Sequence, residues 1–168
     1  MARSRTIGLI TAAIMALTSF VAIGSPALAA ASVTYIYPAG QACAGFDLKI
    51  DQTGSAKAPK VFTDENGNPV RQLTAGKGFA LRFTNQNTGA TYSLKANGSV
   101  TKVTFNADGT QTFVTTGHNV LILFPTDIPA GPTTTVYVGR VVFNVAPDGV
   151  FTLRSTSGTS TDICAALV

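Results

Sequence analysis

The chain alternates between short runs of Val, Thr, Phe, Ile and Tyr and clusters of Gly, Asn, Asp and Pro, which restricts it to β structure. The first group of residues favours strands and the second favours turns. Residues 45–51 alternate strictly, with Phe46, Leu48 and Ile50 on one face and charged side chains on the other. This alternation is typical of a strand that covers a core with one face and meets water with the other.

Turn-forming clusters divide the strands. They occupy residues 64–69, 106–109 and 146–149. Asn97 and Gly98 are a strong hairpin signal, because both residue types tolerate positive φ. A break is predicted at residues 117–119. The run that follows, residues 120–124, is apolar on both faces, which favours a central strand.

We predict an all-β fold, an antiparallel meander of about nine strands folded as a β-sandwich or a flattened barrel. Most neighbouring strands between residues 78 and 155 are joined by tight turns, and about nine strands are too many for one flat sheet to bury well. Local turns do not reveal which strands pair at the seam, so sandwich and barrel both stay open. Residues 30–168 are expected to form a single all-β domain.

The N-terminal segment has the order of a bacterial-type secretory signal peptide. Arg3 and Arg5 precede a mostly apolar stretch, residues 7–23, and a small-residue site ends at Ala29. We predict that residues 1–29 are a signal peptide cut after Ala29 and that the protein is secreted. No apolar segment near the C-terminus is long enough to span a bilayer, so no membrane attachment is expected after cleavage.

Two cysteines, Cys43 and Cys164, are predicted to form a disulfide. An even pair in an exported protein favours a bond, and a loop of this length is worth about 4–5 kcal/mol in chain-entropy terms. A metal or redox pair is disfavoured because there is no C-x-x-C motif and only one histidine in the chain.

The charge pattern disfavours nucleic acid as a partner. Cleavage after Ala29 would leave ten basic and eight acidic residues, a formal net charge of +2. The basic residues are spread along the chain, whereas nucleic-acid binding needs a clustered basic face. No cofactor or metal is expected, because the chain has neither a phosphate-cradling glycine loop nor a metal-ligand spacing.

Three residues are retained as candidate ligand-binding residues, and no catalytic residue is assigned. His118 is the only histidine, and no G-x-S-x-G motif accompanies it. Most acidic residues lie in turns, where bonding to the backbone explains them. Asp127 instead lies between prolines in the long connection of residues 125–132, where its ordinary role would also be to bond backbone amides. Arg140 could accompany it in a hydrolase.

Four segments resemble a group of small secreted, β-rich proteins of actinobacterial type. They are residues 62–71, 123–127, 138–143 and 157–164. The resemblance extends over nearly all of the chain between Cys43 and Cys164. It implies secretion, one domain and a terminal disulfide, and it implies no activity and no site residues.

The leading hypothesis is a secreted non-enzymatic β domain that binds an unknown extracellular ligand or protein, or shields the cell surface. It is based on two observations: the sequence shows no recognisable combination of catalytic residues, and its polar faces are rich in Thr, Asn and Gly. Three alternatives are a small-ligand carrier in a β-barrel, an extracellular hydrolase that uses Asp127 with Arg140 or His118, and a protease inhibitor that presents residues 125–132.

Expression of the full chain in a secreting bacterial host is expected to release a protein that begins at Ala30, because signal peptidase cuts after a small-residue site. Intact mass and N-terminal sequencing of protein from the medium measure this directly. Protein that keeps Met1 and stays with the cells would contradict the prediction.

Overall fold

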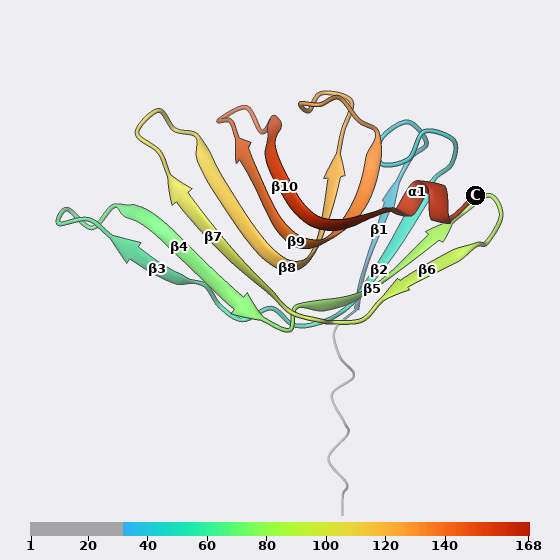
Figure 1. Ribbon diagram of the computed structural model, residues 1–168, viewed down its shortest axis with the longest axis horizontal. Coiled ribbons are helices and arrows are strands. Elements are labelled where there is room, and N and C mark those ends of the chain that lie inside the picture. The colour runs from blue at the N-terminus through green and yellow to red at the C-terminus, as the bar shows by residue number, and fades with distance from the viewer. Residues whose placement is uncertain (1–31) are drawn as a thin grey trace, which may run out of the picture.

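The computed structural model describes residues 32–168, which form ten strands and one short helix (Figure 1). The predicted all-β class is confirmed, with ten strands in place of about nine. The predicted signal peptide, residues 1–29, lies outside the described residues, and the single domain over residues 30–168 stays a prediction. The elements are β1 (Ser32–Tyr37), β2 (Leu48–Gly54), β3 (Lys60–Thr63), β4 (Pro69–Gly76), β5 (Phe79–Asn85), β6 (Thr91–Leu94), β7 (Ser99–Phe105), β8 (Gln111–Leu123), β9 (Thr133–Val145), β10 (Phe151–Asp162) and α1 (Ile163–Ala166).

The strands form two open antiparallel sheets. Sheet A has the order β1-β2-β5-β6, and sheet B has the order β10-β9-β8-β7-β4-β3. Each sheet has two end strands, so the arrangement is that of a β-sandwich, and the flattened barrel is not formed. The predicted sequential antiparallel pairing holds for β1–β2, β3–β4, β5–β6 and β7 to β10, whereas β2 pairs with β5 and β4 pairs with β7 across the chain.

Several local predictions are confirmed. Leu48 and Ile50 of β2 are buried in the core, and Phe46 is buried with them although it precedes the strand, which begins at Leu48 and not at residue 45. The turn over residues 64–69 joins β3 to β4, and the turns at 106–109 and 146–149 join β7 to β8 and β9 to β10. Their aspartates accept hydrogen bonds from nearby backbone amides, as expected of turn residues.

Gly117, Gly139 and Gly158 form a row across β8, β9 and β10, where they lie directly opposite one another. Their φ angles are 94°, 151° and 94°. A Cβ at Gly139 would collide with the backbone carbonyl of Ser157, and one at Gly158 with that of Val138. Only glycine fits such a close approach. We call these three residues the glycine row.

The three long strands bend at the glycine row, and Figure 1 shows β8, β9 and β10 curving upward on both sides. The break predicted at residues 117–119 is therefore wrong, because β8 continues through it from Gln111 to Leu123. A glycine within a strand marks a sharp bend as readily as an interruption. The bend divides each long strand into two arms. The first arms are residues 111–116 of β8 and the parts of β9 and β10 aligned with them. The second arms are residues 118–123 of β8 and the parts of β9 and β10 aligned with those residues.

The bend creates two cores. Inside it, Leu121 of the second arm of β8 packs with Val141 and Phe143, which pair with its first arm. The ring of Phe143 stacks on that of Phe113 with centroids 4.8 Å apart. Outside it, Val136 packs with the sheet A core, which includes Phe83.

The apolar run after the glycine row is buried on both faces, as its sequence predicts. Val120 and Ile122 pack on the sheet A core, whereas Leu121 and Leu123 pack inside the bend. The run is not hydrogen-bonded on both sides, however. β7 pairs with β8 only as far as Gly117, so residues 118–123 have β9 as their strand partner.

The two sheets diverge beside the glycine row. Three connections lead from one sheet to the other: residues 55–59 join β2 to β3, and the other two, which we call the crossings, lie beside the row. β4 leads into β5 through residues 77–78, and β6 leads into β7 through residues 95–98. The hairpin predicted at Asn97 and Gly98 is therefore wrong, because β6 and β7 belong to different sheets. Gly98 joins the crossings instead: its N–H donates to the Lys77 carbonyl (2.9 Å), and its carbonyl accepts from the His118 N–H (3.1 Å).

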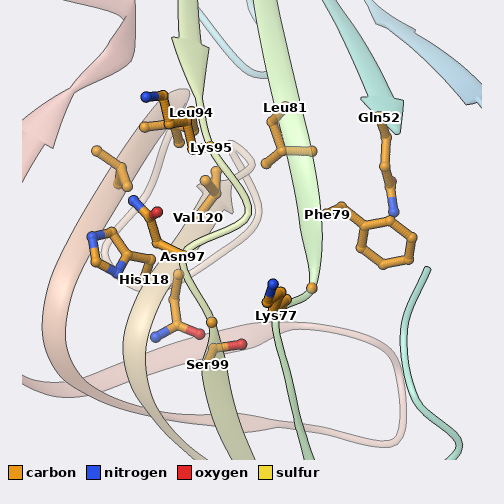
Figure 2. A pocket seen from close by; sticks show the side chains of 14 residues that line it. Gln52, Lys77, Phe79, Leu81, Leu94, Lys95, Asn97, Ser99, His118 and Val120 are labelled. Atoms are coloured by element: carbon orange, nitrogen blue, oxygen red, sulfur yellow. The ribbon is translucent and has the colours of Figure 1, made fainter. Parts of the chain in front are cut away.

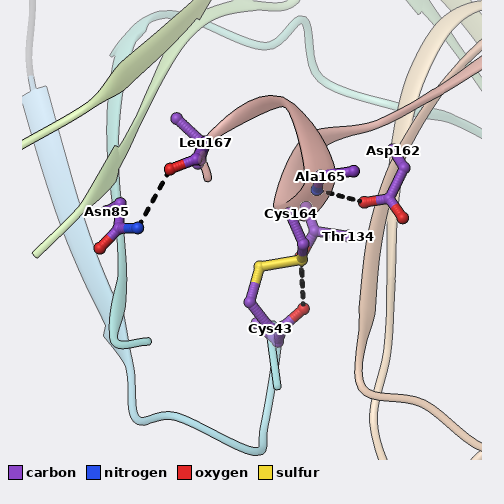
Figure 3. Close-up of a disulfide and its surroundings, with 8 residues drawn as sticks. Cys43, Asn85, Thr134, Asp162, Cys164, Ala165 and Leu167 are labelled. Atoms are coloured by element: carbon purple, nitrogen blue, oxygen red, sulfur yellow. Dashed lines mark hydrogen bonds between the residues drawn. A yellow bond between two sulfur atoms is a disulfide. The ribbon is translucent and has the colours of Figure 1, made fainter. Parts of the chain in front are cut away.

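The predicted disulfide between Cys43 and Cys164 is confirmed, with Cα atoms 5.6 Å apart (Figure 3). Two buried hydrogen bonds hold the same region. The Thr134 hydroxyl donates to the Ala42 carbonyl (2.9 Å), and the Asn85 amide donates to the Leu167 carbonyl (3.1 Å). The C-terminal segment is thereby tied to sheet A.

Replacement Gly139→Ala is expected to lower the free energy of unfolding by about 3 kcal/mol, because the new Cβ meets the Ser157 carbonyl and the backbone keeps a positive φ. Chemical denaturation measures the change. Gly45→Ala is the matched control, since Gly45 has open space around it and no positive φ. It should change stability by less than about 0.5 kcal/mol. Equal losses in both variants would contradict the role of the row.

Candidate functional site

The three residues selected from the sequence do not converge on one site. His118 and Arg140 are exposed on the outer face of β8 and β9, on opposite sides of the glycine row, where they pair with Val138 and Thr116. Asp127 lies in the connection between β8 and β9 and is 4% exposed. Only His118 borders a sizeable pocket.

The Asp127 carboxylate is fully occupied by the backbone. One oxygen accepts from the Phe124 N–H (2.7 Å) and the other from the Phe151 N–H (2.9 Å). These bonds fix the connection of residues 125–132 to the start of β10. This arrangement is the ordinary role that the sequence suggested for Asp127, and it leaves the carboxylate poorly placed to act on a substrate.

The same connection is anchored along its backbone. The Ile128 N–H donates to the Phe151 carbonyl (2.8 Å), and the Leu153 N–H donates to the Ile128 carbonyl (2.7 Å). The side chain of Ile128 is exposed. A protease inhibitor presents the backbone of its loop to an enzyme, so these bonds weaken that alternative.

A pocket of about 260 Å³ opens where the two sheets diverge, and we call it the fork pocket (Figure 2). Sheet A and the second arms of β8 and β9 form its walls, and the two crossings form its rim. Its lining residues are Gln52, Lys77, Gly78, Phe79, Leu81, Leu94, Lys95, Asn97, Gly98, Ser99, His118, Asn119, Val120 and Val136.

The apolar walls of the fork pocket follow from strand alternation. Phe79 and Leu81 lie on the inner face of β5, and Leu94 pairs with Leu81 from β6. Val120 and Val136 pair with each other on the facing arms of β8 and β9. Because the sheets separate here, these side chains line a space that the core does not fill.

The rim of the fork pocket is basic. Lys77, Lys95 and His118 line it, and the lining includes no carboxylate. Within residues 32–168, the one salt bridge joins Lys49 to Asp51 (3.0 Å), so neither rim lysine has an acidic partner. The site therefore offers positive charge beside an apolar surface, which suits an anionic group attached to an apolar body.

Asp51 does not line the fork pocket, but it lines a separate hollow of about 450 Å³ on sheet A, together with Lys95. Its carboxylate accepts from the Thr34 hydroxyl (2.7 Å) on the outer face of sheet A. This hydrogen bond, followed by that from Lys49, lowers the pKa of Asp51 below its usual value. A carboxyl group with a lowered pKa stays ionised near neutral pH and is a poor general acid.

A second cavity of about 230 Å³ lies inside the bend of sheet B. Phe113, Val141 and Phe143 line it, together with Thr115 and Asn119. The Asn119 side-chain nitrogen is buried and has no hydrogen-bond partner among the described residues. The cavity is mostly apolar and belongs to the inner core, so it is a weaker candidate than the fork pocket.

Within residues 32–168 no three His, Cys, Asp or Glu side chains gather where they could hold a metal ion. The same residues contain no helix with the length and apolar character needed to cross a membrane.

No protein-family model, curated protein or solved structure matches the chain. The resemblance to small secreted proteins of actinobacterial type is therefore supported only as far as a small β-rich fold, and no family is identified.

Sequence reasoning found His118 and missed the two rim lysines. Lys77 lies between Gly76 and Gly78, and Lys95 lies two residues before Asn97. Lysine beside turn-forming residues is an ordinary solubilising pattern, so neither position stood out. The fold brings both lysines to one pocket, because the two crossings lie side by side.

Replacement Asp127→Ala is expected to reduce the free energy of unfolding by about 2–3 kcal/mol, because two backbone amides lose a charged acceptor. The control Asp148→Ala removes one exposed bond to the Val150 N–H and should cost about 0.5–1 kcal/mol. Urea unfolding followed by far-ultraviolet circular dichroism measures both. A stable Asp127→Ala protein would show that the carboxylate is free for another role.

Proposed function

We propose that this chain is a secreted, non-enzymatic binding domain that takes a small anionic amphiphile in the fork pocket. The observation that carries the proposal is the pairing of an apolar cleft with a basic rim. Phe79, Leu81 and Leu94 supply the apolar wall, and Lys77 and Lys95 supply charge without an acidic partner.

The size of the fork pocket restricts the ligand. About 260 Å³ lies just below the usual range for small-molecule sites, so the part of the ligand that the pocket buries is a short chain or a single ring. Removal of its apolar part from water contributes about 25 cal/mol of favourable binding free energy for each Å² of apolar surface buried. Its acidic group lies at the rim, where the lysines can reach it while it remains partly hydrated.

Extracellular location is supported by the disulfide and by the N-terminal sequence. The Cys43–Cys164 bond is of the kind that persists in oxidising compartments. Residues 1–29 have the order of a cleavable signal. The proposed ligand is thus one found outside the cytoplasm.

The non-enzymatic part of the proposal is supported by how the acidic residues are used. Asp127 bonds two amides, and hydrogen bonds within their turns lower the pKa of Asp64 and Asp108. His118 is exposed, and no carboxylate shares its pocket. Hydrolysis by paired acids or by a triad would need such groups to meet at one point.

Binding is expected to be saturable for anilinonaphthalene sulfonate, a fluorescent anionic amphiphile, and octanoate should displace it. Lys77→Met and Lys95→Met should each raise the dissociation constant of the probe about two- to fivefold, as expected for loss of one exposed charge pair. Added salt should raise the dissociation constant of the wild-type protein toward the values of the variants, because salt screens the charges of the rim lysines. Fluorescence titration measures each dissociation constant.

Three controls sharpen this test. Lys60→Met removes an exposed lysine from β3, whose Nζ lies over the Phe62 ring, and should leave binding unchanged. Leu94→Phe fills the pocket without changing charge and should abolish binding. Octylamine carries the same tail with the opposite charge, so displacement equal to that by octanoate would refute the anionic class. Probe binding insensitive to Leu94→Phe would refute the pocket.

A further inference from the structure

The edge of sheet B at β10 is open over most of its length. The connection of residues 125–132 covers only its first part, residues 151–153, through Ile128 and Asp127. Every residue from Arg154 to Asp162 is exposed, and β10 is an end strand of the sheet among the described residues. β10 contains twelve residues, with neither proline nor lysine among them. Short length, proline, charged side chains, bulges and covering loops are the devices by which edge strands normally avoid pairing with other chains. In β10 the bulge and the covering loop are confined to residues 151–155, so residues 156–161 have none of these devices.

The other end strands differ from β10. β3 and β6 have four residues each, and β3 carries Lys60. β1 has six residues. The open part of β10, residues 154–162, is therefore the longest edge offered by residues 32–168, and the outer backbone groups available to another strand lie in this part.

The open part of β10 is symmetric about the glycine row. A bulge between Leu153 and Ser155 leaves Arg154 without a partner on β9. At the other end, Asp162 caps α1 by accepting from the Ala165 N–H (3.1 Å). The regular segment between these two features is residues 155–161, and Gly158 is its central residue.

We propose that β10 pairs with β10 of a second copy of this chain, antiparallel, about a two-fold axis at Gly158. Ser157 of one copy then lies opposite Thr159 of the other. Arg154 lies opposite Asp162 at both ends, so two pairs of opposite charges close the interface. A two-fold interface requires such self-complementarity, because each surface meets itself.

The bend of β10 selects a second copy over an unrelated extended segment. A straight strand cannot follow both arms of a strand that turns sharply at Gly158 (φ 94°). A second β10 has the same bend at the same register. A two-fold axis perpendicular to the sheet also carries the glycine row onto itself, so the bend continues through all six long strands of the pair.

Protein expressed from the full chain is expected to show a concentration-dependent equilibrium between monomer and dimer in analytical ultracentrifugation. Arg154→Asp places like charges opposite each other twice and should raise the dissociation constant about tenfold. Ser157→Lys adds a charged side chain to the edge and should raise it at least about tenfold. Lys57→Asp, with the same charge change as Arg154→Asp, is the control and should leave the dimer intact.

Cysteine cross-linking tests the register. The chain has no free cysteine, so each introduced thiol is the only one. A mixture of Ser157→Cys and Thr159→Cys, or of Thr156→Cys and Ser160→Cys, should form mixed disulfide dimers faster than either variant alone. Thermal unfolding confirms that each variant folds. A protein that stays monomeric at its solubility limit would overturn the proposal, and so would a dimer that neither substitution weakens or that lacks the mixed cross-links.

Discussion

The close approach of backbones at Gly117, Gly139 and Gly158 is the constraint on which the rest of the structure depends. The neighbouring carbonyls leave no room for a Cβ at Gly139 or Gly158, and this contact lets three adjacent strands bend along one line. Without the bend, the long strands would leave one apolar face uncovered. With it, one face closes on itself around Phe143, and the outer face of the second arms meets sheet A around Val136.

The fork pocket is a direct consequence of that bend. The second arms turn away from β7, while β5 and β6 continue in the other sheet, so the two layers separate beside the row. Gly98 joins the layers through its bonds to Lys77 and His118, which fixes the rim at the point of separation. Charge gathers there because both crossings are exposed and each carries a lysine. A rigid backbone thus positions the site, although its polar side chains are exposed.

Short sequence patterns predicted individual strands and turns, but they did not predict features that depend on which distant strands pair. The alternation of Phe46, Leu48 and Ile50 identified a half-buried strand, because burial of one face needs only period two. Asn97 and Gly98 have hairpin chemistry, yet a turn signal does not state whether the flanking strands meet. His118 was a candidate because it is the only histidine, whereas Lys77 and Lys95 gain meaning only from the crossings. Asp127 was singled out by its loop, but Phe151, which occupies one of its oxygens, follows 24 residues later and cannot be inferred from spacing.

The proposed dimer edge and the fork pocket lie on different parts of sheet B, and this separation has a consequence for both. β10 supplies none of the residues that line the pocket, which is formed by β8, β9, sheet A and the crossings. Pairing through β10 therefore leaves each pocket unobstructed by that strand. The two-fold axis also places the first arm of one copy beside the second arm of the other, so the two sheets A lie at opposite ends of the paired strands. A dimer built in this way presents two separate pockets, and binding at one need not depend on binding at the other.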